Sequence, residues 1–232
     1  MTYCIGIKTN DGLVFASDSR TNAGLDNVNI YSKMMTHDVG DRTVVIVTSG
    51  NLGTSQAVYK SIEKDLNSSS GIMNLNTCND FEQIASYIGS LNIEHSSPQG
   101  INTDNVLLGS TFIVGGQIKG QQHELYLVYP QGNYIRPADS KPYLVIGEVK
   151  YGKPILDRVI KPEVSIGDAS RCAMISMDST LKSDLTVGPP IDFAVHKKNA
   201  DKLVTLECLN VTDDAYSKVC NEWSEGIFKV FD

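Results

Sequence analysis

Residues 1–20 read MTYCIGIKTNDGLVFASDSR, with a threonine directly after the first methionine. Two apolar runs, YCIGIK and LVFASDSR, flank the polar turn TNDG, a pattern typical of a β-hairpin with its turn at residues 10–12. A hairpin returns the end of its second arm to the start of its first arm. The stretch therefore predicts a sheet that begins almost at the first residue, next to Thr2.

Hydrophobic periodicity extends this pattern along the chain. Apolar runs predict further strands at 42–50, 111–116, 124–130, 143–147, 191–198 and 202–209. Apolar residues three and four apart predict helices after Gly50, after Asn79 as N-cap, over 153–160 and 168–184, and from Thr212 as N-cap to Phe228. Because the helices come in sequential pairs between groups of strands, we expect an α+β fold with two packed antiparallel sheets and a helix pair outside each.

Length, charge and cysteine content limit the classes of function. The chain has 232 residues, 41% of them hydrophobic, so we expect one domain over 1–232 with a large core. The net charge of -7 argues against a nucleic-acid partner and against anchoring on a membrane. No apolar run approaches the ~18 residues that cross a bilayer, and residues 1–20 lack a signal-peptide pattern, which predicts a cytoplasmic protein. Without a CxxC spacing, the cysteines indicate mostly buried thiols in a reducing compartment: Cys4, Cys78, Cys172, Cys208 and Cys220.

Thr2 can supply both the nucleophile and the base of a hydrolase. Removal of the first methionine leaves the hydroxyl beside a free α-amine, whose unperturbed pKa of roughly 7.7 to 8.0 keeps part of it neutral near pH 7. Such a site also needs a cation to tune the amine and the hydroxyl, a carboxylate to hold that cation, and a donor for the oxyanion. The candidates are Lys33, Asp18 and Gly50. This chemistry requires no histidine, no cofactor and no metal.

The spacing of these residues matches a known family. The pattern T-x-x-x-G-I-K-x-x-D-G-x-x-x-A-x-D-x-R, from Thr2 to Arg20, resembles the opening of proteasome β-type subunits, which are N-terminal nucleophile hydrolases. The similarity continues through Gly24, Lys33 and the SGNLG turn at 49–53. Within that family, three segments are similar to the bacterial proteasome homologues called Anbu: MTYC at the start, KYGKPILDR at 150–158 and LTVGPPIDFAV at 185–195.

The resemblance implies a four-layer αββα sandwich, the N-terminal nucleophile hydrolase fold, and a threonine peptidase of the proteasome type. Thr2 matches the family's nucleophile, Asp18 its acidic partner, Lys33 its lysine, Gly50 its oxyanion glycine and Arg20 a supporting residue. The substrate is then a peptide or protein. The family also implies a homo-oligomer, in a ring or spiral that encloses the active sites, whereas the sequence does not reveal whether an ATPase acts with it.

Two positions depart from the family's pattern. The lysine of ordinary proteasome subunits lies one residue later, where this chain has Met34, so either the loop between Gly24 and Lys33 is one residue shorter or the lysine is assigned wrongly. We favour the shorter loop, because no other lysine lies between Lys8 and Lys60.

The second departure concerns the group that holds the amine. The family has an aspartate and a serine three residues apart; Asp184 matches the first, Val187 stands at the second, and Thr186 offers a neighbouring hydroxyl. The resemblance also suggests residues that line the substrate pocket: Thr21, Asn22 and Ser32.

Two alternatives to a peptidase remain open at this stage. N-terminal nucleophile hydrolases include amidases and acylases, so the substrate of the same chemistry could be a small amide. The chain could also be a self-assembling scaffold with little turnover, since the amine exists only after Met1 is removed. Taken singly, each candidate has an ordinary explanation: Asp18 as the end of a strand, Lys33 as a solvated surface charge and Gly50 as a turn glycine. The catalytic interpretation therefore depends on their combination.

Overall fold

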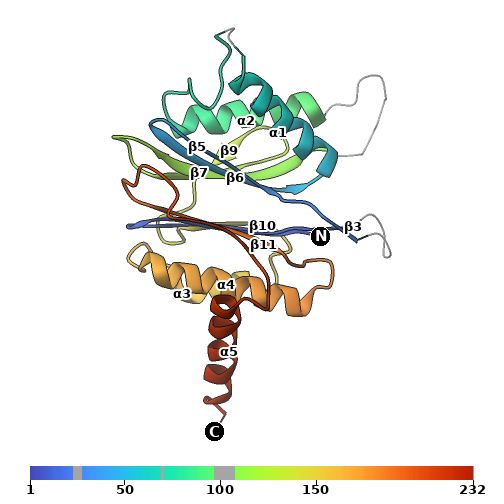
Figure 1. The fold of residues 1–232 in the computed structure, drawn as a ribbon, viewed down its shortest axis with the longest axis vertical. Coiled ribbons are helices and arrows are strands. Elements are labelled where there is room, and N and C mark those ends of the chain that lie inside the picture. The colour runs from blue at the N-terminus through green and yellow to red at the C-terminus, as the bar shows by residue number, and fades with distance from the viewer. Residues whose placement is uncertain (23–27, 69–70, 97–107, 232) are drawn as a thin grey trace.

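The structure, a computed structural model, describes residues 1–22, 28–68, 71–96 and 108–231. Within these ranges, two five-stranded antiparallel sheets stack face to face, with helices on both outer faces (Figure 1). The predicted αββα sandwich is confirmed, as is the order of strands, two helices, strands, two helices and strands.

The first sheet contains the predicted N-terminal hairpin. Its strand order is β10-β1-β2-β11-β12, with bounds Tyr143–Gly147, Tyr3–Thr9, Gly12–Asp18, Ile191–Lys197 and Thr205–Leu209. The second sheet has the order β5-β6-β7-β8-β9, with bounds Met34–Val39, Arg42–Gly50, Ser110–Ile118, Glu124–Val128 and Tyr134–Ile135. A short ribbon, β3 (Arg20–Asn22) with β4 (Val28–Ile30), leaves the first sheet after β2.

One helix pair covers each sheet. Helices α1 (Leu52–Leu66) and α2 (Phe81–Ser96) pack on the second sheet, and α3 (Lys153–Val159) and α4 (Ile166–Ser183) pack on the first (Figure 1). Helix α5 (Asp214–Phe228) contacts α4 and projects from the body, so that the C-terminus lies far from the sheets (Figure 1).

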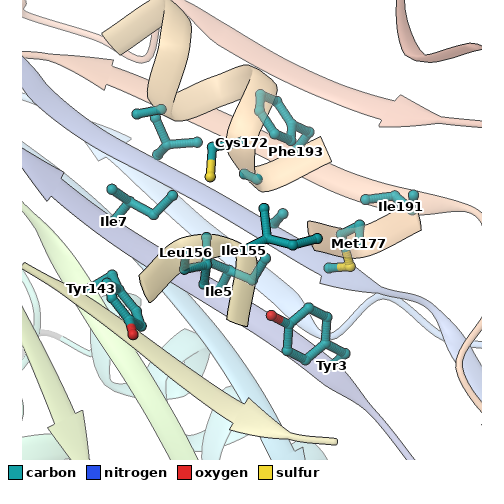
Figure 2. Packing of buried hydrophobic residues seen from close by; sticks show 14 of the residues in the cluster. Tyr3, Ile5, Ile7, Tyr143, Ile155, Leu156, Cys172, Met177, Ile191 and Phe193 are labelled. Carbon is teal, nitrogen blue, oxygen red and sulfur yellow. The ribbon is translucent and has the colours of Figure 1, made fainter. Parts of the chain in front are cut away.

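The alternation of side chains along β1 determines which face of the sheet carries Thr2. Tyr3, Ile5 and Ile7 belong to the cluster under α3 and α4, where Figure 2 shows them with Leu156, Cys172 and Met177. Cys4 points the other way, into the core between the sheets, as predicted. Because side chains two residues apart share a face of a strand, the same alternation directs Thr2 toward the space between the sheets.

Close approach of the sheets requires a glycine on that face. A Cβ added to Gly6 would lie 2.8 Å from Ile113 Cγ2 and 3.0 Å from Leu125 Cδ1, both on the opposite sheet. The two sheets therefore pack tightly in the middle of β1.

The structure corrects several sequence-based predictions. Strand β5, the β3–β4 ribbon and β9 were not predicted, because their residues are short runs of mixed polarity and their backbone partners come from neighbouring strands. The N-cap of α2 is Asp80 rather than Asn79: the Asp80 carboxylate accepts the Gln83 N–H at 2.8 Å, and the Gln83 side chain accepts the Asn79 N–H at 2.9 Å. The N-cap of α5 is Asp213 rather than Thr212, which lies one residue before the cap.

The described ranges contain no helix that is both long and apolar enough to cross a membrane. All five cysteines lie within those ranges and are free thiols. Four are buried as predicted, whereas Cys208 on the edge strand β12 is exposed.

Candidate active site

Thr2 lies immediately before β1, at one end of the sandwich. Its carbonyl oxygen accepts the Glu148 N–H at 2.7 Å, which fixes its main chain to the end of β10. Gly147 precedes that contact with a φ of +89°, and a Cβ at this position would overlap the Thr2 carbonyl. A glycine is therefore required where β10 meets the start of β1.

Asp18 and Lys33 form a buried ion pair beside Thr2. Lys33 Nζ donates to Asp18 Oδ1 and to the Arg20 carbonyl, both at 2.7 Å, and the side chains are 5% and 0% exposed. Asp18 Oδ1 also accepts the N–H of Tyr3, the residue after Thr2, at 3.0 Å. The lysine that pairs with Asp18 is thus Lys33, while Met34 begins β5.

Burial and hydrogen bonding act in opposite directions on the pKa of the Asp18 carboxyl. Burial raises the pKa of the Asp18 carboxyl above its ordinary value, and the Lys33 ammonium and the Tyr3 and Gly188 N–H groups oppose that rise. A buried charge is tolerated only when such partners replace water. The three donors hold the Asp18 carboxylate in place, and that carboxylate and the Arg20 carbonyl in turn hold the Lys33 ammonium near Thr2.

Gly50 ends β6 opposite Thr2 and immediately before α1. Its φ is +120°, a backbone conformation that favours glycine, and the residue is exposed. Asn51 caps α1 by accepting the Thr54 N–H at 3.1 Å. The turn explanation of Gly50 is thus correct, and the same turn presents its main chain, at a helix N-terminus, to the space beside Thr2.

A cavity of about 370 Å³ joins these groups. Its lining comes from both sheets and from the start of α1: Met1, Thr2, Arg20, Thr21, Lys33, Thr48, Ser49, Gly50, Leu52, Ser55 and Gly147. Asp18 lies behind this surface and reaches the cavity through Lys33. The structure therefore brings together a hydroxyl, an ammonium group and a glycine turn that are up to 48 residues apart in sequence.

Asp184 and Thr186 lie on the loop after α4, near the chain's N-terminus. The Thr186 hydroxyl and N–H both donate to Asp184 Oδ1, at 2.6 and 2.8 Å. Burial alone would raise the pKa of the Asp184 carboxyl, but these hydrogen bonds, the N-terminal ammonium and Lys150 outweigh it and lower the pKa. Asp184 and the Thr186 hydroxyl are thus hydrogen-bonded to each other, although they are two residues apart rather than the three of the family's pattern.

Arg20 links the same loop to β3. Its Nη1 donates to the Leu185 carbonyl at 2.6 Å, and its guanidinium packs so closely on Gly188 that a side chain there would overlap it. Arg20 therefore contributes in two ways: its side chain holds the loop of Asp184, and its carbonyl holds Lys33.

Not every predicted pocket residue lines the cavity. Thr21 does, whereas the Ser32 hydroxyl instead donates to Asp192 Oδ2 at 2.8 Å. The side chain of Asn22 and all of Gly24 lie outside the described residues. Sequence reasoning missed five lining residues: Thr48, Ser49, Leu52, Ser55 and Gly147. Of these, only Ser49 and Leu52 stood in a segment that the sequence had singled out, the SGNLG turn.

Metal-binding side chains and histidines are two other kinds of group that could take part in chemistry near Thr2. Among the residues that the structure describes, no group of three or more His, Cys, Asp or Glu side chains could hold a metal ion. His123 and His196 lie at the opposite end of the sandwich, where they contact Thr9 and Gln117. The arrangement around Thr2 instead combines a hydroxyl with a fixed cation and an accessible glycine main chain.

Comparisons with known proteins agree with this geometry. The family profile described as "Proteasome subunit" matches residues 2–196. Among solved structures, the chain is similar to Anbu (Gly-1) mutant from Hyphomicrobium sp. strain MC1, with 36% identity, coverage of 100% of this chain and 97% of that one, and a TM-score of 0.91.

Two further structures show the same similarity. Anbu (ancestral beta-subunit) from Yersinia bercovieri is 33% identical, with 99% and 95% of the two chains covered and a TM-score of 0.92. The helical assembly of the Anbu complex from Pseudomonas aeruginosa is 36% identical, with 99% and 95% covered and a TM-score of 0.91. No curated protein sequence matches this chain.

Proposed function

This chain belongs to the proteasome subunit family, and from that premise we propose that it is a threonine peptidase. It hydrolyses peptide bonds through an acyl-enzyme on Thr2 after Met1 is removed. Residues 1–232 act as one proteasome β-subunit-like domain. No cofactor takes part in this mechanism.

The reaction uses the groups that meet at the cavity. The Thr2 amine, directly or through water, takes the hydroxyl proton while Thr2 Oγ1 attacks the scissile carbonyl carbon. The Gly50 N–H stabilises the developing oxyanion, and the amine returns the proton to the leaving amine of the peptide. A water molecule, deprotonated by the same amine, then attacks the ester carbonyl carbon; the bond to Thr2 Oγ1 breaks, the amine returns the proton to Oγ1, and the carboxylic acid product leaves.

The observation that carries this proposal is the buried Asp18–Lys33 pair beside Thr2. A cation close to an amine and a hydroxyl favours the neutral amine and the deprotonated hydroxyl, which are the reactive forms. Holding a lysine at 5% exposure costs desolvation energy, and its partners compensate for that cost only in one geometry. Perturbed, buried charges of this kind beside a cavity are typical of functional sites.

The Asp184–Thr186 pair supports a role in holding the amine. Its carboxylate already interacts with the N-terminal ammonium of the chain that begins at Met1. Removal of Met1 transfers that charge to Thr2, one residue deeper in the site. We assign Asp184 and Thr186 to orientation of the amine, with Arg20 holding their loop.

The cavity and the relatives support a peptide substrate and self-assembly. A volume of about 370 Å³ is sufficient for a side chain and the adjoining main chain of a peptide, and Thr21 and Leu52 contribute to the pocket wall. One similar structure is a helical assembly, which favours a homo-oligomer here, in a ring or spiral. Five free thiols fit a reducing compartment such as the cytoplasm.

The decisive test replaces Thr2 in the full-length protein. Thr2→Ala removes the nucleophile but keeps the small side chain, so covalent labelling by a peptidyl electrophile that captures an N-terminal threonine should fall to background. Thr2→Ser is the matched control, since it retains a hydroxyl and should still be labelled. Intact mass shows in each variant whether Met1 has been removed.

The outcome also separates the alternative functions. Labelling of Thr2→Ala at the wild-type rate would exclude Thr2 as the nucleophile. Efficient turnover of small amides with none of peptides would favour an amidase, whereas retention of Met1 on protein isolated from its natural host would favour a scaffold.

A further inference from the structure

The main chain of Lys33 is held from the helix layer by a tyrosine. The Tyr59 hydroxyl, on α1, donates to the Lys33 carbonyl oxygen at 2.9 Å. The Thr48 N–H donates to the same oxygen at 3.1 Å. One residue earlier, the Ser32 hydroxyl donates to Asp192. The backbone that carries the lysine is thus fixed by three separate elements.

Tyr59 is suited to act as a fixed donor. Its side chain is almost fully buried, and its ring packs edge-on against Phe112 with 6.3 Å between the ring centroids. Burial raises the pKa of the Tyr59 hydroxyl well above its ordinary value, so the group remains protonated. Loss of the hydroxyl alone leaves the ring packing intact, and the Lys33 carbonyl keeps its bond to Thr48.

We propose that Tyr59 is a positioning residue for the reaction, which sets the Lys33 ammonium relative to Thr2 by anchoring the Lys33 carbonyl to α1. This inference rests on the proposed function. It also gives α1 a second task, because the same helix begins beside Gly50. The same rigid helix then positions both the oxyanion donor and the lysine. A small displacement of either group from Thr2 lowers the reaction rate.

Contacts along the first two turns of α1 support this assignment. The Ser55 hydroxyl lies 2.9 Å from Thr48 Oγ1 and donates to Ser110 Oγ at 2.9 Å, which ties the helix to β6 and β7. Tyr59 follows one turn later and reaches past β6 to Lys33, with its oxygen also 3.3 Å from the Ile46 carbonyl. The helix therefore cannot shift along the sheet without moving the Lys33 main chain.

The test compares Tyr59→Phe with Tyr87→Phe in the full-length protein. Tyr87, on α2, is a similarly buried tyrosine whose hydroxyl donates to Asp65 Oδ2 at 2.7 Å, away from Lys33. We expect the Tyr59→Phe variant to be labelled about tenfold more slowly than the Tyr87→Phe variant, the effect of one well-placed hydrogen bond. The pH of half-maximal labelling should rise, because a displaced Lys33 ammonium favours the neutral amine and the deprotonated hydroxyl of Thr2 less. The KM for a peptide should stay within about twofold of the wild-type value, since the hydroxyl does not contact the cavity.

A readout independent of activity separates this inference from the proposed function. The NMR resonance of the Lys33 Cε methylene should shift in Tyr59→Phe and stay in place in Tyr87→Phe. If both variants match in labelling rate, pH dependence and Lys33 resonance, the positioning role is wrong. If wild-type protein is not labelled at all, the proposed function fails, and the Lys33 resonance alone decides whether Tyr59 positions the lysine.

Discussion

The two ends of the sandwich differ in the way that they hold charge. At the Thr2 end, a cavity of about 370 Å³ covers the Asp18–Lys33 pair. At the Thr9 end of β1, roughly 20 Å away along the strand, a larger cavity of about 580 Å³ lies between loops and contains the Lys8–Glu124 pair. The larger cavity has its paired side chains 29% and 20% exposed, and its charges remain hydrated.

This difference shows that the larger of the two cavities is not the one beside the buried ion pair. At the Thr2 end, desolvation of a lysine and an aspartate lowers the stability of the fold, and main-chain donors and acceptors fix the two side chains in place. At the Thr9 end, an ion pair in contact with solvent contributes little energy and little geometric precision. Buried, fully partnered charge is therefore the feature on which we base the choice of the Thr2 end as the candidate site.

The largest effect is expected from neutralising Lys33 at the Thr2 end, with neutralisation of Lys8 at the Thr9 end as the comparison. Lys33→Met leaves the Asp18 carboxyl buried without its cation, so the free energy of unfolding should fall by about 3 to 5 kcal/mol and Thr2 labelling should be lost. Lys8→Met removes a partly exposed pair and should cost at most about 1 kcal/mol, with labelling unchanged. Urea unfolding and the labelling rate measure both effects. Equal destabilisation by the two substitutions would contradict the contrast between the ends.

A smaller effect is expected from a matched pair of glycines. Gly147 and Gly120 both have positive φ, +89° and +84°, but only Gly147 lies against another main chain, that of Thr2. Gly147→Ala should cost about 3 kcal/mol because strain and overlap add, whereas Gly120→Ala, in an open turn, should cost about 1 kcal/mol. Thermal unfolding of the two variants checks the difference, and a Gly147→Ala protein as stable as Gly120→Ala would show that the start of β1 can move aside.

The smallest effect is a pH dependence that arises at the Thr9 end. Burial lowers the pKa of both His123 and His196, each of which has an Nδ1 atom without a hydrogen-bond partner in the described part of the chain. The unfolded chain then binds protons more tightly than the folded chain, so stability is complete above about pH 6.5 and falls as the pH drops below it.

We expect the wild-type protein to lose about 1 kcal/mol between pH 7 and pH 5, a window above the range where most carboxylates titrate. The double substitution His123→Gln and His196→Gln should flatten this dependence, whereas His37→Gln, at a half-exposed site, should not. Unfolding in urea at both pH values gives the measurement. A dependence that survives the double substitution would assign it to other groups.

Much of the site could be predicted because its residues stand at fixed points of the local structure. The hairpin of β1 and β2 places Asp18 near Thr2, and the end of β6 places Gly50 before a helix. By contrast, Ser32 was expected in the pocket but bonds Asp192 on β11, a strand that begins 159 residues later. The pairing of Tyr59 with Lys33 was equally invisible, since it joins an ordinary core position of α1 to a loop.

The sequence by itself determined the layers of this protein and the identity of its candidate reactive groups. Period-two and helical patterns need only neighbouring residues to operate, and Thr2, Asp18, Lys33 and Gly50 follow a spacing specific to the family. Tertiary structure decided the edge strand β5, the alignment of Asp184 with Thr186, and the donors around the Lys33 carbonyl. These depend on hydrogen bonds between segments distant in sequence, whose geometry exists only once the two sheets and their helices have packed.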